Sequence, residues 1–158
     1  MQSAKNPRFE SLLQAYGESH QNPFNKSVHW WCVPLIFFSI FGLVACIPVP
    51  SFFPEGLHWA NVVLVLVLLY YAWLSPLLAL GFLLFGGLVA LGNQQLLSYG
   101  RPYLLTFSLL VFFLAWAGQF AGHAVEGKKP SFLKDIQFLL IGPAWLMHFI
   151  LKKLRLPY

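Results

Sequence analysis

The chain has 158 residues, of which 58% are hydrophobic and only 9% are charged. A soluble domain carries about 25% charged residues, and one core of this size cannot hide such an apolar excess from water. This composition excludes an ordinary soluble enzyme, a disordered chain and a disulfide scaffold. It predicts one all-α domain over residues 1–158, a multi-pass helical membrane bundle. The net charge of +5 is expected to reflect membrane topology and not a nucleic-acid partner.

The polar N-terminal segment, residues 1–28, is predicted to contain a short amphipathic helix over residues 7–19. Four apolar side chains recur there at helical spacing: Phe9, Leu12, Leu13 and Tyr16. Residues 20–27 read as a turn, with Asn22-Pro23 and Asn25 as helix breakers.

Residues 31–122 are predicted to form four membrane spans, the first over residues 31–47. The uncharged stretch 58–92 would be roughly 52 Å long as one helix, against a hydrocarbon core of about 30 Å. It should therefore fold into two spans that break at Ser75-Pro76. A loop over residues 93–101 and a fourth span over residues 102–122 follow.

The C-terminal segment, residues 123–158, contains an apolar stretch over residues 136–151 that Gly142-Pro143 interrupts. It is short for a span, so a buried or re-entrant helix is expected. With four spans, nine of the ten basic residues lie on one side of the membrane and only Arg101 lies on the other. Because basic loops stay in the cytoplasm, both termini are predicted to be cytoplasmic. The host membrane is either a bacterial inner membrane or the endoplasmic reticulum.

This topology places four of the five histidines on one side of the membrane and the fifth on the other. His20, His29, His123 and His148 share the cytoplasmic side, whereas His58 opens the second span on the opposite side. Imidazole is the commonest protein ligand for iron, zinc and copper, although a histidine at a membrane boundary often only bonds a helix end or a lipid headgroup. The four histidines are therefore candidate metal ligands.

Three polar residues accompany these histidines, and two of them have two interpretations. Asn25 lies between His20 and His29 in a turn that could bring both onto one centre. Gln119 and Glu126 share a helical face with His123. Gln119 either bonds a neighbouring helix or lines the site. Glu126 either orients or joins the ligands, or is a solvated acid paired with a nearby lysine.

Two blocks of this sequence resemble the signatures of the Mpo1-like family of membrane proteins. The first is Tyr16-x3-His20-x4-Asn25-x3-His29, followed by a hydrophobic helix. The second begins Trp116-x2-Gln119-Phe120-x-Gly122-His123 and continues x2-Glu126-Gly127-x2-Pro130, and Gly142-Pro143 near the end also fits. The resemblance runs from about residue 9 to residue 150.

The resemblance implies an iron(II)-dependent dioxygenase of fatty-acid α-oxidation. Such an enzyme shortens a long-chain 2-hydroxy fatty acid by one carbon with O₂ and releases carbon dioxide. His20, His29 and His123 match the expected iron ligands best, and His148 or Glu126 is the candidate fourth ligand. Asn25, Gln119 and Glu126 would be the supporting polar groups of the catalytic site.

Two other functions remain open from the sequence. The histidines could serve a different reaction, such as lipid hydrolysis, or the chain could be a metal-binding or structural membrane protein without catalysis. The basic residues near the C-terminus either set the topology and contact membrane lipid or receive the carboxylate of a fatty acid. Oligomeric state and substrate chain length do not follow from the sequence.

The topology makes a prediction about His58. His58→Ala should leave metal content and activity intact, because this residue is expected roughly a bilayer away from the other histidines. Metal analysis of the purified, folded variant tests this. Loss of metal without loss of folding would contradict the four-span topology.

Overall fold

The computed structural model describes residues 7–18, 20–127 and 140–156, and in these residues it contains six α-helices and no strand. The helix α1 covers Pro7–Glu18 and confirms the predicted amphipathic helix, with Phe9, Leu13 and Tyr16 buried. The helix α2 covers Pro23–Ala45 and begins earlier than predicted. Asn22 caps it by accepting a hydrogen bond from the Phe24 backbone N–H, and Pro23 is its first residue. The Asn-Pro pair thus starts a helix, as proline at the first helical position does, and Asn25 lies within it.

The long uncharged stretch forms two helices, as predicted. The helix α3 covers Trp59–Leu74 and α4 covers Pro76–Leu97, with Ser75 between them. The expected loop over residues 93–101 is much shorter, because α4 continues to Leu97 and α5 begins at Arg101. The helix α5 covers Arg101–Glu126, so His123 and Glu126 of the second motif both lie in it.

The C-terminal helix α7 covers Ile141–Lys153 and is buried, as expected for this apolar stretch. Gly142 and Pro143 stand in its first turn and do not interrupt it. The Tyr71 hydroxyl donates a hydrogen bond to the Leu140 carbonyl, which ties the start of α7 to α3. Residues 136–139, where the predicted helix was to begin, lie outside the described residues.

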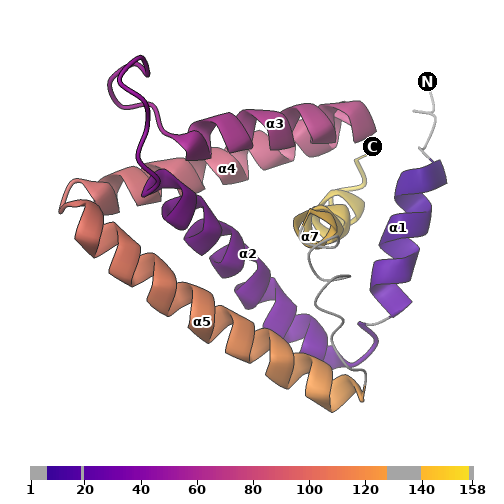
Figure 1. Cartoon of the computed structure of the whole chain (residues 1–158). Coiled ribbons are helices and arrows are strands. Elements are labelled where there is room, and N and C mark those ends of the chain that lie inside the picture. Colours follow the sequence, from indigo (N-terminus) through magenta and orange to yellow (C-terminus); the bar gives the residue numbers. More distant parts are fainter. Residues whose placement is uncertain (1–6, 19, 128–139, 157–158) are drawn as a thin grey trace.

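The helices form two antiparallel pairs, α2 with α5 and α3 with α4 (Figure 1). The pairs meet near the α4–α5 turn and diverge away from it, and α7 and α1 lie between the diverging ends. The start of α2 and the end of α5 lie at one end of the bundle. The helices α1 and α7 lie near this end.

Among the described residues, three helices are long and apolar enough to cross a membrane: α2, α4 and α5. The second predicted span, α3, has 16 residues and is shorter. Large apolar side chains cover the outer faces of α4 and α5, as lipid contact requires. They include Leu80, Leu84, Leu88, Leu91, Leu110, Phe113 and Leu114.

Glycines let α2 and α5 approach each other closely. A Cβ added to Gly118 would lie 2.7 Å from the Cys32 Sγ atom. A Cβ on Gly42 would overlap the side-chain oxygens of Asn93 and Ser108, which are buried beside it. Small residues of this kind allow helices to pack at short distance where no water drives their association.

Gly42→Ala should therefore destabilise the bundle by about 1–3 kcal/mol, because the added methyl group forces the neighbouring side chains to move. Gly87→Ala is the matched control, since a Cβ there meets nothing within 4 Å and alanine favours the helix. Melting temperatures of the two variants in the same detergent measure the difference. Equal melting temperatures would contradict the close packing at Gly42.

Candidate metal centre

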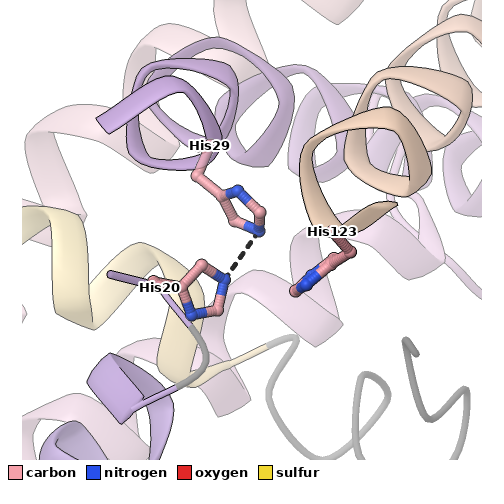
Figure 2. Close-up of side chains that lie close together, drawn as sticks. All are labelled: His20, His29 and His123. Atoms are coloured by element: carbon pink, nitrogen blue, oxygen red, sulfur yellow. Dashed lines mark hydrogen bonds between the residues drawn. The ribbon is translucent and has the colours of Figure 1, made fainter. Parts of the chain in front are cut away.

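Three histidines from separate segments meet at one end of the bundle. His20 comes from the connection between α1 and α2, His29 from α2 and His123 from the last turns of α5 (Figure 2). One ring nitrogen of each lies within 4.8 Å of the others, and all three side chains are buried. Among the described residues, these three histidines form the group that could hold a metal ion.

The short connection between α1 and α2 turns His20 toward His29. The His20 backbone N–H donates to the Gly17 carbonyl at 3.0 Å and so closes the end of α1. The Asn22 cap then starts α2 only two residues later. A helix end, a tight turn and a helix start thus bring two histidines nine residues apart in the sequence next to each other.

Hydrogen bonds to the backbone select the tautomer of two of the rings. His20 Nδ1 lies 2.6 Å from the Tyr16 carbonyl oxygen, and His29 Nδ1 lies 2.9 Å from the Asn25 carbonyl oxygen. A carbonyl oxygen only accepts, so each Nδ1 carries the proton and, in the neutral rings, each Nε2 carries a lone pair. These backbone carbonyls are typical outer partners of metal-bound histidines.

The two Nε2 atoms face each other at 2.9 Å. Two lone pairs at this distance repel each other unless a cation or an additional proton lies between them. Neutral imidazole nitrogens are favoured ligands of divalent transition metals. The donor set therefore fits such a metal, with His123 beside the pair as a third candidate ligand.

Aromatic rings cover the histidines from α1 and α7. The Tyr16 ring stacks on His20 with a centroid distance of 4.2 Å, and the Trp145 ring lies 5.4 Å from His20. Sequence reasoning missed Trp145, although its position three residues before His148 puts both on neighbouring parts of one helix. The rings exclude water from one side of the histidines.

The carboxylate of Glu126 binds the connection that carries His20. Its oxygens accept hydrogen bonds from the backbone N–H groups of Gln21 and Asn22 and from the Asn25 side-chain amide. The distances are between 2.8 and 3.1 Å. Asn25 and Glu126 thus lie beside the centre and contact each other, but Glu126 is not in the group of candidate ligands.

Gln119 lies one turn before His123 on α5 and is buried. Its Oε1 atom has no hydrogen-bond partner among the described residues. This leaves a buried acceptor one turn from His123 on α5, and the role of Gln119 at the site stays a prediction. His148 is half-buried on α7, its ring contacts that of Phe149, and it is not in the group of three. Its role as fourth ligand stays a prediction.

His58 lies apart from this group, as predicted. It precedes α3, which follows the far end of α2 (Figure 1), and its ring contacts the Asn61 side-chain oxygen at 2.7 Å. This contact gives His58 a local role at the start of a helix.

Replacing any one of the three clustered histidines should abolish metal binding. His29→Ala is the sharpest test, because it removes half of the facing Nε2 pair. We expect about one divalent metal per chain in the unmodified protein and in His58→Ala, and little in His29→Ala, by metal analysis after detergent purification. Metal retained by His29→Ala would contradict this centre.

Comparison with known families gives one match. The model of the family described as "2-hydroxy-palmitic acid dioxygenase Mpo1-like" matches residues 7–154. No curated protein and no solved structure matched the chain. The match covers most of the chain and includes the three histidines, both helix pairs and α7. The chain therefore belongs to the Mpo1-like family, whose description names a dioxygenase.

Proposed function

We propose that this protein is an iron(II)-dependent dioxygenase that shortens long-chain 2-hydroxy fatty acids by one carbon. The observation that carries the proposal is the pair of Nε2 atoms 2.9 Å apart beside His123. The family description supplies the reaction type and the 2-hydroxy acid. Iron is one of the redox-active metals that imidazole ligands suit, and a dioxygenase uses O₂.

His20, His29 and His123 would hold the iron through neutral imidazole nitrogens. Bound iron(II) supplies a redox centre for O₂ and a Lewis acid for the hydroxyl and carboxylate of the substrate. Three protein ligands leave coordination positions open for these groups. A fourth protein ligand, for which His148 is the candidate, would leave fewer.

The surrounding side chains would orient the substrate and exclude water. The buried Oε1 atom of Gln119 is an acceptor that the 2-hydroxyl group of a substrate could satisfy. Tyr16 and Trp145 form an apolar wall on the side of His20. Asn25 and Glu126 support the segment that carries two of the histidines.

The reaction balances without an external reductant. One 2-hydroxy acid and one O₂ give one acid shorter by one carbon, one CO₂ and one water. The carbon–carbon bond next to the carboxylate breaks, the carbon that carried the hydroxyl becomes the new carboxylate, and O₂ is reduced with electrons from the substrate itself.

The membrane would deliver the substrate. The centre lies at the end of the α2–α5 pair, next to helices that could span a membrane, so an acyl tail could stay among apolar side chains while its polar head reaches the histidines. The distribution of basic residues favours a cytoplasmic position for this end and for both termini.

The test is to incubate iron-loaded protein with 2-hydroxypalmitate under oxygen and to measure the shorter acid and CO₂. We expect equal amounts of both products with the unmodified protein. Gln119→Leu should keep its iron and lose activity by about 10-fold or more, because the site loses its hydroxyl acceptor.

Two controls separate this function from its alternatives. Palmitate without the 2-hydroxyl group should give no product, and zinc-loaded protein should be inactive because zinc has no redox chemistry. Iron bound without product would favour a metal-binding protein of another function. Turnover by the zinc form would favour hydrolysis.

A further inference from the structure

We infer that Glu126 is a positioning residue that holds the segments carrying all three histidines in register, and does so before any metal binds. The inference deepens the proposed metal centre and rests on it only where metal affinity is concerned. On this assignment Glu126 acts through the segments that carry the histidines and not as a metal ligand.

Both oxygens of the carboxylate take part. Oε1 accepts hydrogen bonds from the backbone N–H groups of Gln21 at 2.8 Å and Asn22 at 3.1 Å. Oε2 accepts from the Asn22 N–H at 2.9 Å and from the Asn25 Nδ2 atom at 3.1 Å. Hydrogen bonds to an ionised acceptor are among the strongest in proteins, and a carboxylate is favoured beside the start of a helix such as α2.

These contacts connect Glu126 to each ligand in turn. Gln21 directly follows His20, so its N–H fixes the backbone that carries this ring. The Asn25 side-chain amide donates a hydrogen bond to the carboxylate, and the Asn25 backbone carbonyl accepts one from His29 Nδ1–H. His123 lies one turn before Glu126 on α5. One carboxylate therefore links segments about 100 residues apart in the chain.

Gly122 permits this arrangement. A Cβ at this position would lie 2.5 Å from the Asn25 Oδ1 atom, closer than real contacts allow. Only glycine lets α5 come near enough for Glu126 to reach Asn25 and the start of α2. Gly122 and Glu126 lie on successive turns of α5, and both contribute to its contact with the start of α2.

The grouping of the side chains favours positioning over ligation. Among the described residues, the group that could hold a metal ion consists of the three histidines and does not include Glu126. Removal of a positioning residue should weaken the metal centre without changing which atoms bind the metal. Outer partners of this kind typically affect metal affinity by about 10–100-fold.

The first experiment uses metal-free, full-length protein and needs no metal site. Hydrogen exchange of the backbone N–H groups of Gln21 and Asn22 is measured by mass spectrometry in Glu126→Gln, with Glu55→Gln as the matched control. Glu55 carries the same charge in the exposed connection between α2 and α3. We expect exchange in residues 20–25 to rise at least 10-fold in Glu126→Gln and to stay unchanged in Glu55→Gln. Unchanged exchange in both would overturn the inference.

The second experiment measures Co²⁺ affinity by chelator competition and records the visible spectrum of the Co²⁺ protein. We expect Glu126→Gln and Gly122→Ala to bind about 10-fold or more weakly, with the band positions of the unmodified protein. A shifted spectrum in Glu126→Gln would make Glu126 a ligand and overturn the positioning role. Equal Co²⁺ affinity in Glu126→Gln and the unmodified protein would also overturn the positioning role, because Glu126 would then have no effect on the metal centre.

The two experiments distinguish a failure of the proposed metal centre from a failure of the positioning role. If the unmodified protein binds no Co²⁺ or iron, the proposed metal centre fails, and the exchange measurement still decides whether Glu126 holds the segment. If metal binds and Glu126→Gln alters neither exchange nor affinity, only the positioning role fails.

Discussion

The close antiparallel contact of α2 with α5 is the constraint on which the rest of the structure depends. Gly118 and Gly122 on α5 face Cys32 and Asn25 on α2 at distances that a larger residue would not allow. This contact brings His29 and His123 to the same end of the pair. It also brings Glu126 to the start of α2, where the chain has just passed through His20. If α2 and α5 were farther apart, His123 would not reach the two histidines near the start of α2.

The centre is organised by the backbone as much as by side chains. The carbonyl groups of Tyr16 and Asn25 accept hydrogen bonds from Nδ1–H of His20 and His29, and the Nε2 atoms of the two rings face each other. Burial beneath Tyr16 and Trp145 removes the water that would otherwise separate these atoms. The protein thus gathers three buried imidazoles whose ring nitrogens lie close enough together to hold a cation, and this is the physical basis for regarding the group as a candidate metal centre.

Much of the fold could be predicted from local patterns. The apolar runs and the Ser75-Pro76 break predicted the right number of helices between residues 23 and 126. The errors occur where a residue has two local roles. Asn22-Pro23 reads as a breaker but is a cap followed by a favoured first helical residue. Asn93 reads as a loop residue, but inside α4 its amide donates to the Val89 and Phe38 carbonyls.

The sequence by itself determined that the chain is an apolar helical protein, that His58 stands apart from the other histidines, and that two motifs carry the candidate ligands. Composition and helical periodicity are local properties, so a sequence can express them. Only the tertiary structure decided that three histidines converge, that Trp145 covers them, and that Glu126 binds the His20 connection instead of an imidazole. These relations depend on how closely and in what register α2 packs against α5, a distance that no single segment encodes.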